Sequence, residues 1–232
     1  MKNYNIKKID ESISYIPASM NPLSADVAFI KTENATWIFD AGSSDEAFDA
    51  ISAVQGKKNI VLSHFHPDHT ANITRLETDK LYLFMSNHTA RYFRNFIDGT
   101  NGGNSDISNS DSGNNKPDVK IVDGTFKDES TGLKICTIPS SHAKGCLCLV
   151  YNDYAFLGDA TYCKEKNGSR VYNVQQLKAE ISFIESLQCR YVCLSHDEKF
   201  VHEKQMILKL LKSIYDKRTE NEPFISVDGF FR

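Results

Sequence analysis

The stretch His64-Phe65-His66-Pro67-Asp68-His69 is the most informative part of this chain. It follows the apolar run NIVLS (59–63) and places three imidazoles and one carboxylate within six residues. Such side chains are costly to bury unless they are hydrogen-bonded or bound to a cation. A polar loop that happens to be rich in histidine is the alternative, but matching ligands elsewhere in the chain favour a metal site.

The spacing within this stretch predicts two directions for its side chains. Alternate side chains of a strand share a face, so His64 and His66 at a strand end point the same way and can bind one ion. Pro67 suits the turn that follows. Beyond the turn, where the next helix begins, Asp68 and His69 are directed toward a second point.

Three further polar residues each come directly after an apolar run. His142 follows KICTIPSS (134–141), Asp159 follows YAFLG (154–158) and His196 follows YVCLS (191–195). Loops at strand ends commonly present functional groups on a rigid scaffold. A lone histidine at such a position is usually structural, but five of the seven histidines lie in this set. The sequence therefore predicts a metal site assembled from distant strand ends.

The order of predicted elements indicates the fold class. Short runs rich in β-branched and aromatic residues predict strands at 12–17, 26–32, 36–42, 59–64, 80–86, 119–124, 134–140, 146–151, 154–159 and 191–196. Helical patterns occur at 45–54, 70–76, 87–97, 175–187 and 202–217. This order predicts an α/β (α+β) fold, an αββα sandwich of two mixed β-sheets flanked by helices. The length of 232 residues fits a single domain over 1–232.

One segment differs in composition from the rest. Residues 99–118 (GTNGGNSDISNSDSGNNKPD) are dominated by Gly, Asn, Ser and Asp. Such a segment cannot bury enough apolar surface to order itself, which predicts a flexible surface insertion. A mobile lid over the active site is the functional alternative.

Charge and composition exclude some classes of partner. The chain is 41% hydrophobic and 25% charged with a net charge of -3, so it has no overall electrostatic attraction to nucleic acid or anionic membranes. The polar N-terminal segment lacks the apolar core of a secretory signal, and no apolar run is long enough to span a bilayer. We expect a cytoplasmic protein with its six cysteines reduced.

The H-x-H-x-D-H motif at 64–69, followed in order by His142, Gly158-Asp159 and Ser195-His196, resembles the metallo-β-lactamase superfamily. The resemblance spans nearly the whole chain. It implies two ligand groups that share Asp159 as a bridge: His64, His66 and His142 for the first ion, and Asp68, His69 and His196 for the second. Asp40, in WIFDAG (37–42), resembles the family's first motif, whose aspartate supports the histidine loop rather than binding metal.

Nitrogen and oxygen ligands without a thiolate suit zinc, and iron or manganese would accept the same set. The resemblance implies a hydrolase in which two divalent ions generate a hydroxide at neutral pH, which attacks a carbonyl or phosphorus. Asp68 is the candidate catalytic residue that steers the nucleophile or passes a proton.

A bridging Asp159 resembles the glyoxalase II and acyl-homoserine lactonase branches of the family. Only one long predicted helix follows His196, which is too little for the glutathione-binding region of glyoxalase II. Tyr162, three residues after Asp159, resembles a lactonase tyrosine that contacts the substrate carbonyl, and an ordinary partly buried aromatic is an equally weighted interpretation. These features favour cleavage of an ester, thioester or lactone of a small molecule.

Two other classes of function are alternatives. A phosphodiesterase or ribonuclease of the same superfamily would need a basic surface, which the acidic balance disfavours. A non-catalytic metal-binding or redox module resembles the flavodiiron proteins, but those favour a Glu where His66 stands and carry an added flavin domain. The oligomeric state is open, and the aromatics of VDGFFR (227–232) leave a dimer contact open as well.

Overall fold

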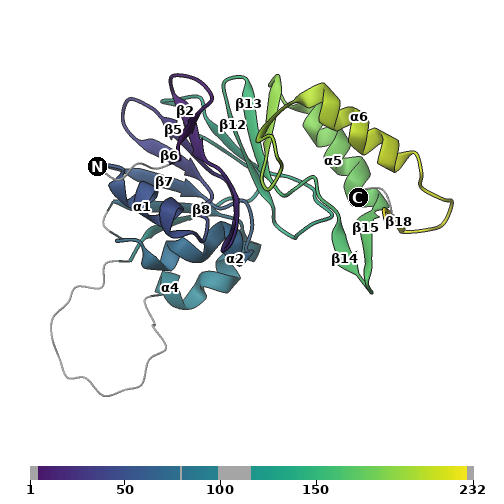
Figure 1. The fold of residues 1–232 in the computed structure, drawn as a ribbon, viewed down its shortest axis with the longest axis horizontal. Helices are drawn as coiled ribbons and strands as arrows, with labels where there is room; N and C mark the ends of the chain where they lie inside the picture. Colours follow the sequence, from purple (N-terminus) through teal and green to yellow (C-terminus); the bar gives the residue numbers. More distant parts are fainter. Residues whose placement is uncertain (1–4, 79, 99–115, 229–232) are drawn as a thin grey trace, which may run out of the picture.

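Two β-sheets packed face to face form the centre of the molecule, with helices on both outer faces (Figure 1). The computed structural model describes residues 5–78, 80–98 and 116–228. The first sheet, over these residues, has the strand order β1 (Lys7–Lys8), β2 (Ile13–Ile16), β5 (Val27–Lys31), β6 (Thr36–Phe39), β7 (Lys58–Val61), β8 (Leu81–Met85) and β9 (Asp118–Ile121). The second has the order β10 (Thr125–Lys127), β11 (Lys134–Thr137), β12 (Leu147–Tyr151), β13 (Tyr154–Gly158), β16 (Tyr191–Leu194) and β17 (Val201–Glu203).

Smaller elements and helices complete the chain. Two small sheets are formed by β3 (Ser19–Met20) with β4 (Leu23–Ser24), and by β14 (Lys164–Lys166), β15 (Ser169–Asn173) and β18 (Phe224–Ser226). The helical segments are α1 (Asp45–Ala53), α2 (Pro67–Thr70), η1 (Ala71–Arg75), α3 (Asn87–Ala90), η2 (Arg91–Phe93), α4 (Arg94–Asp98), α5 (Val174–Ser186) and α6 (Lys204–Tyr215). Figure 1 shows α1, α2 and α4 on the side of the first sheet, and α5 and α6 on the side of the second.

Three apolar layers hold this arrangement together. The central layer lies between the sheets, where Trp37 and Phe39 of the first sheet join a cluster with Phe156 of the second. A second layer joins α1 to the first sheet, and a third joins α5 and α6 to the second sheet. Burial of apolar surface on both faces of each sheet is the physical basis of the αββα sandwich, and the predicted fold class is confirmed.

The connectivity brings several strand ends to one edge of the sandwich. β6, β7 and β8 run parallel in the first sheet, and β13 runs parallel to β16 in the second. Parallel strands end on the same side, so the residues after β6, β7, β13 and β16 emerge close together. A hydrogen bond of 2.7 Å from the Leu147 backbone N–H to the Ser63 carbonyl joins the two sheets at this edge.

Some predicted elements differ from those in the structure. The expected helix at 70–76 is the 3-10 turn η1, and the expected helix at 87–97 is divided into α3, η2 and α4. His202 was predicted to open the last helix, but it lies in β17 and α6 begins at Lys204. Most of the predicted insertion, residues 99–115, lies outside the described residues, as do both aromatics of the VDGFFR segment.

Two negative observations concern the described part of the chain. None of its helices combines the length and apolar character that a bilayer span requires. All six cysteines are described, and each is a free thiol.

Glu180 is an unusual member of the layer beneath α5. It is 0% exposed, and within the described residues neither carboxylate oxygen has a hydrogen-bond partner. Burial raises the pKa of Glu180 well above its usual value. Between the unfolded and folded pKa values the native state binds more protons than the unfolded state, so stability falls as pH rises.

We therefore expect Glu180→Gln to remove this pH dependence. From about pH 5 upward, the wild type should lose stability relative to the variant. The difference between their free energies of unfolding should grow by up to about 1.4 kcal/mol per pH unit. Urea denaturation between about pH 5 and 9 measures this difference. Glu185→Gln, at an exposed position of the same helix paired with Lys212, is the control. Equal pH slopes for Glu180→Gln and wild type would contradict the expectation.

Candidate metal centre

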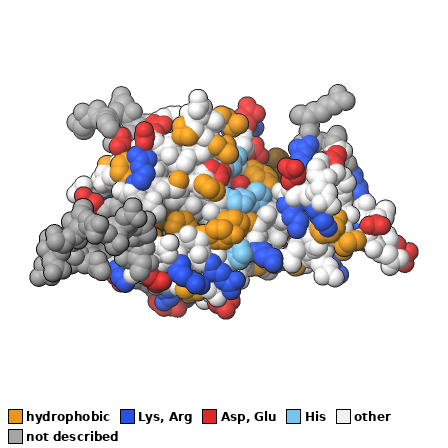
Figure 2. All heavy atoms as spheres, turned by 90° about the horizontal axis from the view of Figure 1, so that it is seen from below, with side chains coloured by type: hydrophobic (Ala, Val, Ile, Leu, Met, Phe, Trp, Pro, Cys, Tyr) orange, Lys and Arg blue, Asp and Glu red, His pale blue; other side chains and the backbone are white. Residues whose placement is uncertain are grey.

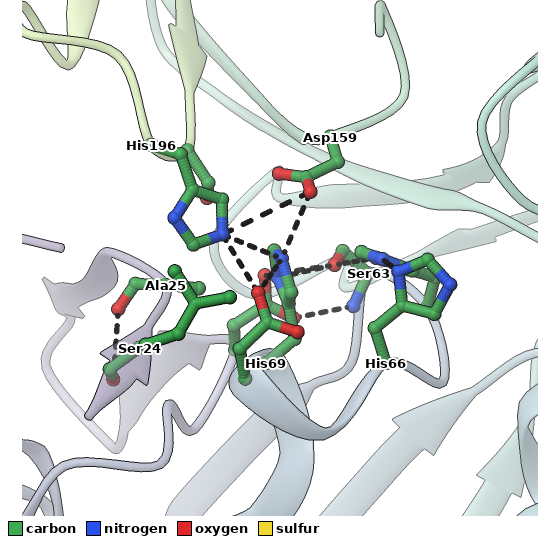
Figure 3. Close-up of polar contacts among 12 residues, drawn as sticks. Ser24, Ala25, Ser63, His66, His69, Asp159 and His196 are labelled. Carbon is green, nitrogen blue, oxygen red and sulfur yellow. Dashed lines mark hydrogen bonds and ion pairs between the residues drawn. The ribbon is translucent and has the colours of Figure 1, made fainter. Parts of the chain in front are cut away.

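The structure brings the seven predicted ligands into two adjacent groups. The first holds His64, His66 and His142, and the second holds Asp68, His69, Asp159 and His196. Within each group the candidate ligand atoms lie within 4.8 Å of one another. Figure 3 shows His196, Asp159 and His69 pointing toward a common centre, with His66 to one side.

Three ring nitrogens converge in the first group. His66 Nδ1 lies 2.8 Å from His64 Nε2 and 3.1 Å from His142 Nε2. His64 is fully buried, and burial together with the neighbouring His69 and His66 lowers its pKa far below the usual value. A neutral imidazole keeps a lone pair on the inward nitrogen, which is the form that binds a metal.

The second group converges on carboxylate oxygens. Asp68 Oδ2 lies 2.9 Å from His196 Nε2 and 3.5 Å from His69 Nε2. Asp159 Oδ2 lies 3.3 Å from His69 Nε2 and 3.5 Å from His142 Nε2. One oxygen of Asp159 therefore faces both groups, as the predicted bridge requires.

The donor atoms fit two divalent cations. Tetrahedral zinc with bonds of about 2.0–2.1 Å places its ligand atoms about 3.3 Å apart, close to the separations within each group. Asp159 is 6% exposed, and its second oxygen, Oδ1, has no hydrogen-bond partner within the described residues. A buried carboxylate oxygen without a donor is costly, and a cation beside that carboxylate would offset this cost.

Asp40 holds the histidine loop from behind. Its carboxylate is fully buried and accepts hydrogen bonds from the Ser63 backbone N–H (2.7 Å) and the Ser63 Oγ (2.8 Å). It also lies 2.7 Å from His69 Nδ1. His64 Nδ1 lies 2.9 Å from Ser63 Oγ. Because Ser63 gives its proton to Asp40, it accepts one from His64, and both His64 and His69 keep Nε2 free for a metal.

Gly158 explains the Gly-Asp pair at the end of β13. Its φ is +57°, a backbone conformation that favours glycine, and a Cβ there would lie 2.9 Å from both Cβ and Oγ of Ser63. The missing side chain lets β13 approach the Ser63 turn. Asp159, the next residue, therefore lies close to the histidines that follow β7 of the first sheet.

Two supporting residues were not predicted from the sequence. Ser63 connects Asp40 with His64, and Asp26 accepts the His196 backbone N–H at 3.0 Å. His196 has a φ of +62°, so this hydrogen bond holds it in an uncommon backbone conformation. Ser63 could have been noticed as the residue before the motif, but nothing in the local sequence connects Asp26 to a residue 170 positions away.

Tyr162 lies beside the first group but uses its hydroxyl within the protein. The ring centroids of Tyr162 and His142 are 6.5 Å apart. The Tyr162 hydroxyl donates a hydrogen bond to the Ser195 carbonyl, next to His196. Its only proton is therefore directed to the turn that presents His196.

An aromatic surface borders the first group. Phe65 stacks on Tyr92 with ring centroids 4.1 Å apart, and His88 lies 5.4 Å from Phe65. Tyr92 is 58% exposed, so this surface is open to solvent. Figure 2 shows one face of the molecule with histidine side chains near its middle and hydrophobic side chains directly beside them.

We expect Asp40→Asn to weaken metal binding. The amide NH₂ would face one of the two Ser63 donors, which misdirects His64 and His69. Loss of such a supporting group typically lowers metal affinity about 10–100-fold. Competition with a zinc chelator measures the affinity, and Asp123→Asn, at an exposed position, is the control. Unchanged affinity in a folded Asp40→Asn protein would contradict this role.

Comparison with known proteins gives one family. Residues 20–196 match the sequence model described as the metallo-beta-lactamase superfamily, and this span includes all seven predicted ligands. Among curated protein sequences, none is significantly similar to the chain.

Solved structures share the fold at low sequence identity. VMB-1 is 14% identical with a TM-score of 0.65, covering 93% of this chain and 97% of that one. The archaeal superfamily protein ST1585 from Sulfolobus tokodaii is 19% identical with a TM-score of 0.56, covering 92% and 90%. A flavo di-iron protein from Thermotoga maritima is 14% identical with a TM-score of 0.62, covering 95% of this chain and 64% of that one. These likenesses show the fold alone.

Proposed function

The chain belongs to the metallo-β-lactamase superfamily, and on this premise we propose that it is a dinuclear metallo-hydrolase that cleaves an ester, thioester or lactone carbonyl of a small molecule. The observation that carries the proposal is the position of Asp159 Oδ2, within 3.5 Å of His142 in one group and 3.3 Å of His69 in the other. A carboxylate shared in this way suits two cations, preferably zinc, a few ångströms apart.

The metal ions would supply Lewis acidity, lowering the pKa of a water molecule and polarising the carbonyl under attack. The protein would supply orientation and proton transfer. Among the three carboxylates of the centre, the Asp68 side chain is the most exposed at 17%, against 8% for Asp159 and 0% for Asp40. Asp68 is thus the carboxylate best placed to orient the attacking water and accept its proton.

Burial alone would raise the pKa of Asp68, but the hydrogen bond with His196 and the charge of His69 lower it below the usual value. Asp68 is therefore ionised at neutral pH and available as a base. The aromatic surface of Phe65 and Tyr92 offers an apolar contact for the part of the substrate next to the carbonyl. The ionised Asp68 suits a hydrolase, and the apolar contact suits the acyl part of an ester, thioester or lactone.

Proton release at constant pH tests the reaction class. The zinc-loaded protein would be offered an acyl-homoserine lactone, a simple thioester, a cephalosporin and a phosphodiester. We expect turnover of the lactone or thioester, and a loss of about 10²–10⁴-fold in Asp68→Asn, the usual range for a general base. Metal content is measured in parallel, because Asp68 is also a candidate ligand. Turnover of the phosphodiester alone would overturn the proposal in favour of a nuclease or phosphodiesterase.

Tyr162 is proposed as a positioning residue for the turn at His196. Tyr162→Phe removes the hydrogen bond to Ser195, so we expect weaker metal binding and lower turnover at limiting zinc. Excess zinc should restore kcat/KM on lactones to nearly the wild-type value. If the fully metallated variant stays slow on lactones, the hydroxyl acts on the substrate carbonyl instead.

A further inference from the structure

The two ends of the metal centre differ in charge. On the side of His142 there is a cavity of about 440 Å³ whose lining includes Lys144 and Lys164. On the side of His196 there is a cavity of about 240 Å³ whose lining holds the carboxylates of Asp26, Asp197 and Glu198 and one lysine, Lys7, so that carboxylates outnumber cations in it. A substrate that lies across both groups of ligands therefore meets opposite charges at its two ends.

The cavity beside His142, which we call the lysine pocket, has an unbalanced positive charge. The described residues that line it include no aspartate or glutamate. In the described part of the chain, neither Lys144 nor Lys164 has a carboxylate within salt-bridge distance. Asp159 is close to the inner nitrogen of His142 but does not line the pocket. The chain has a net charge of -3, so this local excess of lysine is not a general property of its surface.

The pocket also has a fixed wall. Ser140 Oγ donates to the Ala160 carbonyl at 2.6 Å and accepts the His142 backbone N–H at 3.0 Å. Ser141 Oγ accepts the Asn173 backbone N–H at 3.0 Å. These bonds hold the loop that carries both His142 and Lys144, so the backbone of Lys144 and that of the metal ligand belong to one held segment. Lys164 faces the same cavity from β14, where its Nζ lies 5.5 Å from the ring centroid of Phe224.

We propose that the lysine pocket binds an anionic group of the substrate, a carboxylate or a phosphate, while the scissile carbonyl lies at the metal centre. This inference rests on the proposed hydrolase function and narrows it to small esters or thioesters that carry such a group. Two ammonium groups beside an open, partly desolvated cavity are suited to a compact anion. The acidic pocket at His196 would repel that anion, which fixes the direction of the substrate across the centre.

Binding of simple acids tests the pocket without any turnover. The zinc-loaded full chain is titrated calorimetrically with straight-chain dicarboxylates from succinate to adipate, and with monocarboxylates of equal carbon number. We expect one dicarboxylate to bind at least about tenfold more tightly than its monocarboxylate partner, the equivalent of one charge-assisted hydrogen bond. Lys144→Ala and Lys164→Ala should each reduce that ratio toward one, and Lys144→Arg should retain most of it.

Lys166→Ala is the matched control. Lys166 belongs to the same strand as Lys164 and also contacts Phe224, with its Nζ 3.5 Å from the ring centroid, but it does not line the pocket. Lys166→Ala removes the same charge from the same hairpin as Lys164→Ala. An effect of net charge alone would therefore be equal in the two variants. A ratio near one in the wild type, or an equal loss in Lys166→Ala, would overturn the lysine pocket.

A pair of esters with one leaving group separates this inference from the proposed function. 4-Nitrophenyl pentanoate and 4-nitrophenyl hydrogen glutarate have acyl chains of equal length and differ in the terminal carboxylate. We expect the glutarate ester to have a KM about tenfold lower, with the difference lost in the two lysine variants. Equal hydrolysis of both esters by the wild type and every variant would support the hydrolase function and contradict anion binding by the lysine pocket. Lysine-dependent binding of dicarboxylates with no hydrolysis of either ester would support the pocket and overturn the hydrolase.

Discussion

The buried carboxylate of Asp40 is the interaction on which the metal centre depends. A fully buried carboxylate such as that of Asp40 is expensive unless several donors surround it. Here the donors come from Ser63 and His69, so the cost of burial is offset only when the turn after β7 and the start of α2 are in place. Asp40 itself has a φ of +63°, an uncommon conformation that this set of bonds holds.

The same hydrogen-bond network connects the first sheet with the second. Ser63 accepts the Leu147 N–H through its carbonyl and lies against Gly158, so one residue contacts the ends of β12 and β13. His142 and Asp159 come from that second sheet, and His64 and His69 from the turn on the first. Ligands from two sheets can be positioned to within about 0.5 Å of the required geometry only if the sheets are fixed at this edge. The hydrogen bonds around Ser63 provide that fixation.

The sequence identified the side chains that the structure brings together in two groups, because they carry a local signal. Each follows an apolar run, and strand alternation alone aligns His64 with His66. The layer order also followed from the alternation of strands and helices. What could not be predicted depends on contacts between distant residues. Asp26 supports His196 across the whole fold. β14, β15 and β18 form a small sheet whose strands are only three to five residues long and lack an alternating apolar pattern. The expected helix at 87–97 is divided because its apolar residues pack on the first sheet through separate short turns.

Tyr162 illustrates how a motif can be placed correctly and its role still depend on the structure. Its position after Asp159 gives it a place beside His142, which a substrate-contact role also requires. The hydroxyl has one proton, however, and the Ser195 carbonyl receives it. A donor already engaged by a backbone carbonyl gains little by moving to a substrate oxygen, because one hydrogen bond replaces another.

The groups that would carry out the reaction differ from the groups that would select the substrate. The buried centre is built from imidazoles and carboxylates whose geometry is set by the fold, and the same centre serves many reactions on this fold. Discrimination must therefore come from groups that touch the substrate away from the scissile bond. In the function we propose, those groups are the aromatic surface at Phe65, the lysines beside His142 and the acids beside His196. Lys144 follows His142 by two residues on a loop held by the Ser140 and Ser141 hydroxyls, so one segment of the chain would supply both a metal ligand and a group that selects the substrate.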